Sequence, residues 1–489
     1  TLHPYKATDT ASRSYLNYLY AGGMTRYDPV TLDPIANMAE RWEVSQDKLT
    51  YNWYLRKDIK WSDGKPLTAE DWLWTFQQVA NPDNKYPYKS STVDPIAEIT
   101  APEPYRLVVK LKESLVVGLE QADPPNPLPK HVWEKVDWND PAKNPEVAKP
   151  SVVSGMFKLK EWRRDDFAEF EANDLYWQGR PLLDGIQFRI VPDPTVSYQM
   201  LKGGEVDSGI VQPVDFAEAK ANPLLRLYEW EPAAASWDYI GFNLRRPALQ
   251  EARLRRALAF ATDRNSVSKV IYNDLAKPTY SAYPPTAWVY NPDVPKYDFD
   301  PKKAAEELDA AGWKLSPGAK VRSKDGQPLK LKLIFGPNTS KQREAVAVIA
   351  QQAYAEIGVE VAIQGMEWAA YLQALQNPPF DWDLHVGGWQ ATIDPHWMVQ
   401  IWSEASIPQL NSVAYVNKRV EELFEQGSKE FDREKRKKIY QEIQSILSTD
   451  APYVFLVYQL GWTFLNKRLH PNPPTRLGIN YERHKWWIE

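Results

Sequence analysis

Apolar and polar residues alternate along the chain in patterns that predict strands and helices in succession. Over residues 329–333, leucine at every second position alternates with lysine, as is typical of a half-buried strand. A helical pattern follows over residues 342–357, and valine and isoleucine alternate again over residues 359–363. Strand, helix and strand in this order predict a βαβ unit.

Two further stretches have a helical pattern. Apolar residues within 254–261 recur at positions i, i+3, i+4 and i+7, which predicts a helix with one buried face. Residues 417–447 form a longer region rich in lysine and glutamate, and we expect it to break into two helices around Gly427. Loops rich in Pro, Asn and Asp separate these elements, so the fold class is mixed α/β.

Composition excludes several classes of protein. The 489 residues are enough for two large folding units or three ordinary ones. The 59 basic and 64 acidic residues give a net charge of −5, which argues against a nucleic-acid partner. The absence of Cys excludes disulfides, Cys-ligated zinc, iron–sulfur clusters and thiol nucleophiles. We find no apolar run of membrane-spanning length and expect no signal peptide in this sequence.

A search for catalytic motifs finds none. No glycine-rich loop ends in Gly-Lys-Ser/Thr, and no Gly-x-Ser-x-Gly elbow is present. The six histidines are scattered without metal-binding spacing. The 64 acidic residues leave a glycoside hydrolase open as a remote alternative, without specific support. We therefore expect a protein that is not an enzyme, with no catalytic residues, no metal and no cofactor.

Four short stretches form recognisable motifs. Residues 61–66 read Trp-Ser-Asp-Gly-Lys-Pro, and residues 68–71 read Thr-Ala-Glu-Asp. Residues 201–207 read Leu-Lys-Gly-Gly-Glu-Val-Asp, and residues 241–244 read Gly-Phe-Asn-Leu. Together these stretches resemble the family 5 solute-binding proteins of bacterial ABC importers. Physical reasoning assigns the first motif mainly to folding, because Asp-Gly favours a turn and Thr68 with Asp71 has the spacing of a helix capping box.

The resemblance implies an α/β, two-lobed periplasmic-binding-protein fold with a hinge and an extra small domain inserted in the first lobe. By the order of the motifs, the first lobe comprises residues 1–35, 156–237 and 460–489. The inserted domain comprises residues 36–155, and the second lobe comprises residues 238–459.

The same resemblance implies a function. We expect an extracytoplasmic protein, periplasmic or on the cell surface, that captures an oligopeptide and delivers it to ABC permease subunits in the membrane. Whether it carries a lipid anchor stays open. We expect a monomer without a nucleic-acid partner. Some members of the family bind β-linked sugars, so an oligosaccharide is the alternative ligand.

One departure from the family bears directly on the ligand. Peptide-binding relatives carry a Gly-Trp-x-Ala-Asp signature whose Asp receives the amino terminus of the ligand. Here residues 388–395 read Gly-Trp-Gln-Ala-Thr-Ile-Asp-Pro, so Thr392 stands in place of that Asp. Either Asp394 takes the role, or the protein does not bind a free amino terminus. The signature makes Trp389, Gln390 and Ala391 candidate ligand residues as well.

Tryptophan is unusually frequent, with 21 residues, roughly three times an average composition. Core packing accounts for most large aromatic residues, but a binding cleft also uses their flat faces. Further candidate ligand residues are mostly aromatic: Trp368, Trp397, Trp237, Tyr239, Tyr88 and Arg343. Core packing is the alternative for Trp397, and hinge packing is the alternative for Trp237 and Tyr239. Arg343 suits a ligand carboxylate or a solvated helix face.

Overall fold

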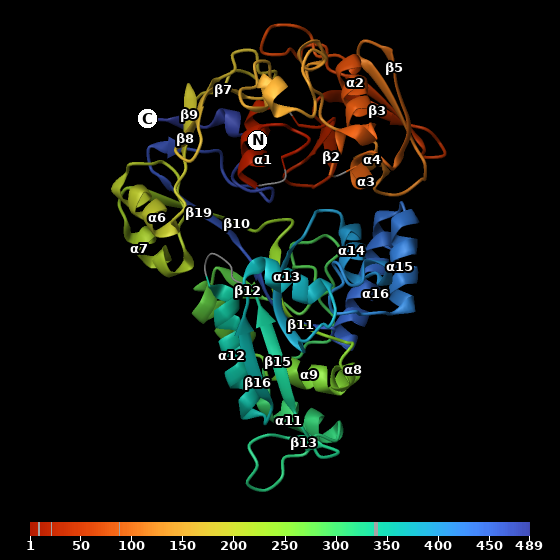
Figure 1. Cartoon of the computed structure of the whole chain (residues 1–489), viewed down its shortest axis with the longest axis vertical. Coiled ribbons are helices and arrows are strands. Elements are labelled where there is room, and N and C mark those ends of the chain that lie inside the picture. The colour runs from red at the N-terminus through yellow and green to blue at the C-terminus, as the bar shows by residue number, and fades with distance from the viewer. Residues whose placement is uncertain (8–9, 21, 88, 337–340) are drawn as a thin grey trace. The chain divides into compact units, whose positions relative to one another are not determined.

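A computed structural model describes residues 1–7, 10–20, 22–87, 89–336 and 341–489 of the chain (Figure 1). The chain divides into two compact units. Unit 1 consists of Thr1–Ile210, Leu224–Arg226 and Leu465–Glu489. Unit 2 consists of Val211–Pro223 and Leu227–Phe464. The three-part division into two lobes and an inserted domain is finer than these units and stays a prediction.

Unit 1 contains two antiparallel sheets that share one apolar core. The four-stranded sheet has the order β3-β4-β6-β5, with strands β3 (Ala39–Val44), β4 (Thr50–Leu55), β5 (Ile96–Glu103) and β6 (Arg106–Leu111). The three-stranded sheet consists of β7 (Phe157–Arg163), β8 (Phe167–Ala172) and β9 (Gly185–Arg189). In β4, Tyr51, Trp53 and Leu55 are buried and alternate with half-buried residues, so this sheet covers the core with one face.

The Trp-Ser-Asp-Gly motif leads into helix α2 (Ala69–Ala80) as predicted. The Asp71 carboxylate accepts a hydrogen bond from the backbone N–H of Thr68 at 3.0 Å, which caps the start of the helix. Its other oxygen accepts the backbone N–H of Lys130 at 3.1 Å. Trp61 and Trp72 are fully buried beside it. The predicted folding role of this motif is therefore confirmed.

Short elements complete unit 1. They are α1 (Thr10–Leu19), β1 (Thr25–Tyr27), β2 (Pro34–Ala36), η1 (Pro82–Asn84), α3 (Lys89–Thr92), α4 (Gly118–Gln121), α5 (Lys130–Trp133), η2 (Pro141–Lys143), η3 (Pro145–Val147), α6 (Pro194–Gly203), β20 (Leu469–His470), η8 (Arg483–Lys485) and β21 (Trp487–Ile488). The boundary between the units falls within β10 (Leu225–Trp230) and β19 (Gly461–Asn466), which pair with each other.

Unit 2 is built on a six-stranded sheet in the order β12-β18-β11-β17-β15-β16. Its strands are β11 (Ser236–Phe242), β12 (Ala276–Pro278), β15 (Lys330–Phe335), β16 (Glu360–Gly365), β17 (Leu384–Gln390) and β18 (Tyr453–Gln459). Strand β15 pairs in parallel with β16 and with β17, and helix α12 (Gln342–Glu356) connects β15 to β16. The predicted βαβ unit is confirmed.

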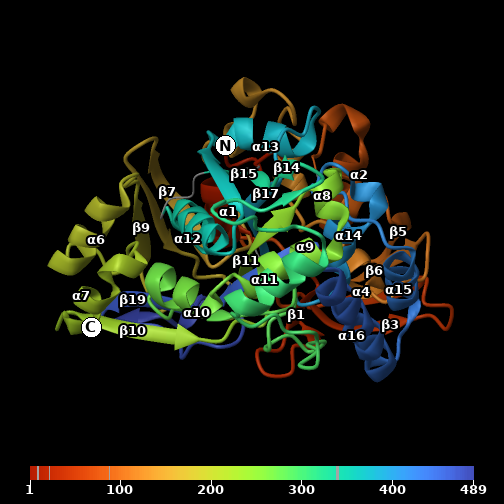
Figure 2. The same cartoon turned by 90° about the horizontal axis from the view of Figure 1, so that it is seen from below.

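One side of this sheet is covered by aliphatic side chains, and we call it the aliphatic face. Helices α9 (Ala252–Phe260) and α11 (Pro301–Ala310), which lie side by side, pack there together with α12 (Figure 2). The predicted helix within residues 254–261 is confirmed as α9. The face is defined by these buried residues: Ile240, Leu254, Leu258, Leu308, Leu331, Leu333, Val361, Leu384, Val386, Val454 and Leu456.

The other side of the sheet carries aromatic side chains, and we call it the aromatic face. Helices α13 (Trp368–Gln376), α14 (Val399–Trp402), α15 (Lys418–Lys429) and α16 (Arg433–Asp450) contribute to its core. The face is defined by these buried residues: Trp237, Tyr239, Tyr371, Trp382, Trp402, Tyr415, Phe424, Tyr440, Tyr453 and Phe455. The two faces follow from strand alternation, because successive side chains point to opposite sides of a sheet.

The region predicted as two helices broken near Gly427 does form two helices, α15 and α16, which lie side by side (Figure 1). The break lies at residues 430–432, close to the predicted position, while Gly427 itself belongs to α15. Gly427 is buried inside α15, where an added Cβ would lie 2.9 Å from the Tyr440 ring. Close packing of the two helices, and not a chain break, explains this glycine.

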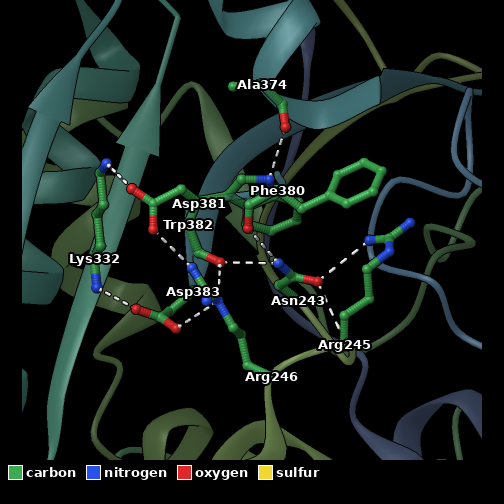
Figure 3. A network of polar contacts seen from close by, with 9 residues as sticks. All are labelled: Asn243, Arg245, Arg246, Lys332, Ala374, Phe380, Asp381, Trp382 and Asp383. Carbon is green, nitrogen blue, oxygen red and sulfur yellow. Dashed lines mark hydrogen bonds and ion pairs between the residues drawn. The ribbon is translucent and has the colours of Figure 1, made fainter. Parts of the chain in front are cut away.

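A network of polar contacts holds the segment that precedes β17 (Figure 3). The buried Asn243 side chain donates to the backbone carbonyls of Trp382 at 2.9 Å and Phe380 at 3.2 Å. Arg246 Nη2 donates to Asp381 Oδ1 at 3.0 Å. The Gly-Phe-Asn-Leu motif therefore fixes the start of β17 from the end of β11, and β17 carries Trp389.

The remaining elements of unit 2 are short. They are η4 (Pro213–Asp215), α7 (Phe216–Ala221), α8 (Pro247–Gln250), α10 (Arg264–Ser266), η5 (Val267–Ile271), β13 (Ser323–Lys324), β14 (Gln327–Pro328), η6 (Pro395–Met398) and η7 (Glu404–Ser406). Across the described residues of both units, no helix combines the length and apolar character needed to cross a membrane.

Candidate functional site

The candidate ligand residues gather along one edge of the unit 2 sheet. Strands β15, β16 and β17 are parallel, so their carboxyl ends lie at the same edge. The antiparallel pairing of β11 with β17 and with β18 places the start of β11 and the end of β18 there too. In open α/β sheets, ligands bind outside the carboxyl ends of the strands. We call this the strand-end edge.

Two glycines before Trp389 make room for side chains that cross from β11. The register pairs Tyr239 with Gly387 and Asp238 with Gly388. A Cβ at Gly387 would lie 2.5 Å from the Tyr239 hydroxyl oxygen, and a Cβ at Gly388 would lie 2.5 Å from Asp238 Oδ1. Both side chains therefore lie against the backbone of β17, and no larger residue fits at either glycine.

Trp389 and Gln390 end β17 at the strand-end edge. Trp389 lies opposite Trp237, is half-buried and packs against the aromatic face. The exposed Gln390 side chain donates to the Ala234 carbonyl at 2.9 Å and accepts from the Ser236 hydroxyl at 2.5 Å. These bonds tie Gln390 to the neighbouring strand, while the ring of the preceding residue, Trp389, stays partly exposed.

Trp237 and Tyr239 are core residues in this structure. They are 1% and 3% exposed. The Tyr239 ring stacks on Tyr453 with centroids 3.9 Å apart, and Trp237 packs against Phe455 at 5.5 Å. Both side chains are thus packed in the unit 2 core, and a ligand contact or a hinge role for either stays a prediction.

The segment after β17 contains the other residues of the predicted signature. Ala391 is buried. Thr392 is exposed, and its hydroxyl donates to the backbone carbonyl of Asp394 at 2.9 Å. Trp397, in η6, is half-buried and packs against the aromatic face. Neighbouring Trp402 is 1% exposed and belongs to the core.

The Asp394 carboxylate is engaged on both oxygens. Arg436 donates from Nη1 to Oδ2 at 2.6 Å and from Nη2 to Oδ1 at 2.9 Å. Oδ1 also accepts the backbone N–H of His396 at 2.8 Å. The side chains of Arg436 and Asp394 are only 5% and 20% exposed. This bidentate pair fixes the segment after β17 to helix α16.

Arg343 and Trp368 lie together at the strand-end edge, at the starts of α12 and α13. The guanidinium carbon of Arg343 lies 5.2 Å from the centroid of the Trp368 ring, a cation–π contact. Trp368 is 43% exposed. Within the described part of the chain, Arg343 has no ion-pair partner, and its buried Nε has no hydrogen-bond acceptor. Arg343 is thus a cation without an ion-pair partner among the described residues, and it lies beside an open aromatic ring.

Sequence reasoning missed Asp238, a carboxylate at the same edge. Its Oδ2 accepts hydrogen bonds from the Tyr272 hydroxyl at 2.6 Å and from Gln459 Nε2 at 3.1 Å. Burial raises the pKa of Asp238, and its two hydrogen bonds and the Arg343 charge oppose that rise. Only the pairing of β11 with β17 and β18 reveals this residue, and a single sequence carries no signal for that pairing.

Two further observations bound the site. A cavity of about 280 Å³ opens between α13 and the outer strands β15 and β16, and its described lining contains none of the predicted ligand residues. The described residues also contain no group of three His, Asp or Glu side chains that could hold a metal ion. The candidate Tyr88 lies outside the described residues.

Comparisons with known proteins identify the family. The sequence model of the bacterial extracellular solute-binding proteins, family 5 (middle region), matches residues 33–407. The chain is 30% identical over 488 residues to the oligopeptide-binding protein AppA of Bacillus subtilis (strain 168), covering 99% of this chain and 88% of that protein. It is 26% identical over 461 residues to the dipeptide-binding protein of Escherichia coli (strain K12), covering 88% and 81%.

A solved structure gives the same result. The oligopeptide-binding protein AppA from Bacillus subtilis, in complex with a nonapeptide, matches with a TM-score of 0.79 at 29% identity, over 99% of this chain and 96% of that one. The resemblance drawn from the motifs and its two-lobed α/β fold are confirmed. The chain belongs to family 5 of the bacterial extracellular solute-binding proteins.

Proposed function

We propose that this protein is the substrate-binding component of a bacterial ABC importer, and that it captures an oligopeptide and delivers it to permease subunits in the membrane. Two relatives named above are an oligopeptide-binding and a dipeptide-binding protein, and one solved relative holds a nonapeptide. A chain that aligns with these proteins over most of its length supports a peptide ligand over the oligosaccharide alternative, which none of these relatives favours.

The strand-end edge of unit 2 is the proposed peptide-binding surface. The observation that carries this assignment is the convergence there of the open Trp368 ring, the partly open Trp389 ring and the unneutralised Arg343. Aromatic faces bind peptide side chains at little entropic cost, and a guanidinium grips a carboxylate with two hydrogen bonds. Gln390, Thr392 and Trp397 lie beside this surface and are proposed as secondary contacts.

The proposal includes the protein's organisation and location. We infer an extracytoplasmic protein that acts as a monomer and binds without chemical turnover. We also infer a hinge between two lobes, with a domain inserted in the first lobe at residues 36–155. Closure over the ligand gives the permease one liganded form to recognise, since a ligand shifts a two-state equilibrium only through its preference for one state.

Isothermal titration calorimetry tests the ligand class. The purified protein is titrated with a synthetic peptide mixture and, separately, with cello- and manno-oligosaccharides. We expect saturable heat with peptides, one ligand bound per chain, and intact peptide recovered by mass spectrometry after prolonged incubation. Heat with a sugar alone overturns the peptide assignment, and cleaved products overturn the assignment as a binding protein.

A further inference from the structure

At the strand-end edge of unit 2, Arg343 is a cation without an ion-pair partner among the described residues, and Asp238, Glu367 and Asp394 are acids. Arg343 has no carboxylate within ion-pair distance in the described part of unit 2. The four undescribed residues of that unit, Pro337 to Ser340, have no acidic side chain. The Arg343 guanidinium therefore has no ion-pair partner on this surface, although its charge acts on the buried Asp238, and one of its sides is covered by the Trp368 ring at 5.2 Å.

The first acidic candidate, Asp394, is not available to a ligand. Arg436 occupies both of its oxygens, at 2.6 and 2.9 Å, and the His396 N–H shares one of them. A ligand ammonium would have to displace a buried guanidinium that has no other carboxylate partner among the described residues, and leaving such a charge unpaired is strongly unfavourable. Thr392 is neutral, and its hydroxyl hydrogen is donated to the Asp394 carbonyl.

The second acidic candidate, Asp238, is turned inward. Its Oδ2 accepts from Tyr272 and Gln459, and its Oδ1 lies against the backbone of Gly388. Both oxygens thus face groups of unit 2. The third acid, Glu367, caps helix α13, because its Oε2 accepts the backbone N–H of Ala369 at 2.9 Å and of Ala370 at 3.4 Å. Each of the three carboxylates is thus held by donors of unit 2, whereas the Arg343 guanidinium beside Trp368 has no ion-pair partner in the described part of that unit.

We infer that the protein recognises its peptide ligand through a carboxylate of the peptide bound at Arg343 and does not recognise the peptide's amino terminus as an ammonium ion. This inference rests on the proposed function and specifies its ligand. The ligand class is peptides with at least one free carboxylate, whether their amino terminus is free or blocked. An ammonium placed at the same edge would meet the like charge of Arg343, whereas a carboxylate there gains charge-assisted hydrogen bonds.

A competition experiment with the unmodified protein tests this inference. A synthetic nonapeptide library is prepared in three forms: unmodified, N-acetylated, and with every carboxyl group converted to an amide. The protein is incubated with equal amounts of the three forms, and the retained peptides are quantified by mass spectrometry. We expect acetylation to change retention by less than about threefold, and amidation to reduce it by about tenfold or more, since hydrogen bonds to charged groups contribute on this scale.

Two variants assign the effect to its residue. Arg343→Gln should remove the discrimination against amidated peptides. Arg419→Gln is the matched control, because it removes the same charge from an exposed residue of α15 that pairs with Glu442 and Glu422, and it should leave the discrimination intact. Asp394→Asn should leave the ratio of acetylated to unmodified peptide unchanged.

Each outcome has one meaning. Depletion of the acetylated library by about tenfold or more shows that the ammonium is recognised and overturns the inference. Equal retention of amidated and unmodified peptides, or discrimination that survives Arg343→Gln, overturns the role of Arg343. Retention of no library in any form overturns the proposed function itself.

Discussion

The two faces of the unit 2 sheet differ in chemistry. The aliphatic face is formed mainly by Leu, Val, Ile and Ala, with Trp313 as its one buried tryptophan among the described residues. The aromatic face contains Trp237, Trp382 and Trp402 together with several tyrosines. Aliphatic side chains are stably buried wherever they fill the available volume and exclude water. Indole N–H, hydroxyl and imidazole groups also need hydrogen-bond partners when they are buried.

This difference separates stability from recognition. The aliphatic face stabilises the sheet by burial and carries no candidate ligand residue. The aromatic face runs to the strand-end edge, where its outermost rings, Trp389 and Trp397, are only half-buried. A substitution on the first face should therefore lower stability alone, whereas the second face should respond in stability, in affinity or in pH dependence according to position.

The largest expected effect is on the aliphatic face. Leu333 is fully buried in β15, with Ile363 of β16 and Leu384 of β17 as its neighbours. Leu333→Ala leaves a cavity there and should lower the free energy of unfolding by about 4 kcal/mol. Urea denaturation followed by circular dichroism measures this change.

The control for this substitution is Leu410→Ala, at a leucine that is 36% exposed, with an expected change within about 0.5 kcal/mol. Peptide affinity of folded Leu333→Ala should equal that of the wild type. A large loss of affinity would contradict the division between the two faces.

The next effect concerns the clamp between Asp394 and Arg436. Asp394→Asn leaves the buried Arg436 guanidinium without its counter-charge and should lower the free energy of unfolding by about 3 kcal/mol. The matched control is Asp381→Asn, because the Asp381 side chain is 69% exposed and pairs with Arg246 and Lys332 at the surface. Its expected loss is below about 1 kcal/mol.

Equal losses for the two aspartate variants would show that the clamp contributes no more than a surface ion pair. Isothermal titration calorimetry with peptide on the same variants separates the loss of stability from any loss of affinity. Normal peptide affinity in Asp394→Asn would show that only a structural contact has been lost.

A smaller effect is expected at the open end of the aromatic face. Trp389→Ala should weaken peptide binding by about 2 kcal/mol if the ring is a central contact, since truncated aromatic anchors commonly lose 1–3 kcal/mol. Its stability should fall less than that of Trp402→Ala, because Trp402 is 1% exposed. Unchanged affinity with lower thermal stability would assign Trp389 to the core instead.

Local patterns in the sequence predicted the aliphatic face well. Alternation over residues 329–333 and 359–363 and the helical period over residues 342–357 identified β15, α12 and β16, because each depends only on near neighbours along the chain. The capping residues Thr68 and Asp71 were predictable for the same reason. The break predicted around Gly427 lies at residues 430–432, but the sequence did not reveal that the glycine itself packs against a distant residue, Tyr440.

The aromatic face and the site depend on pairings that one sequence does not contain. The Asp394 partner, Arg436, lies 42 residues later on another element. The need for glycine at 387 and 388 becomes clear only from the register of β11 against β17, which places Tyr239 and Asp238 against them. Family motifs located the signature around Trp389, but the clamp on Asp394 and the inward turn of Asp238 required the three-dimensional arrangement.

A buried histidine offers the finest test of the aromatic face. His385 is 1% exposed, and its Nδ1 lies 2.9 Å from the Tyr371 hydroxyl oxygen. That hydroxyl donates its hydrogen to the Val386 carbonyl at 2.9 Å, so its oxygen is the acceptor of a hydrogen bond from an N–H group at Nδ1. This assignment leaves Nε2 of a neutral ring without a proton, facing the Ser412 hydroxyl at 3.5 Å.

Burial and the charge of Arg343 lower the pKa of His385 to about 3, so the folded protein keeps this ring neutral. The unfolded chain takes up a proton near the ordinary value of about 6.5, and the free energy of unfolding therefore falls as pH drops below that value, by about 1.4 kcal/mol per pH unit. His385→Gln should remove this contribution to the pH dependence of the free energy of unfolding between pH 6 and pH 4, measured by urea denaturation across that range.

His3 in unit 1 makes a separate contribution, because burial and Lys6 lower its pKa to about 4. The slopes lost in His385→Gln and in His3→Gln should therefore add in the double variant. An unchanged slope in His385→Gln would mean that the aromatic face admits a charged imidazole in the folded protein.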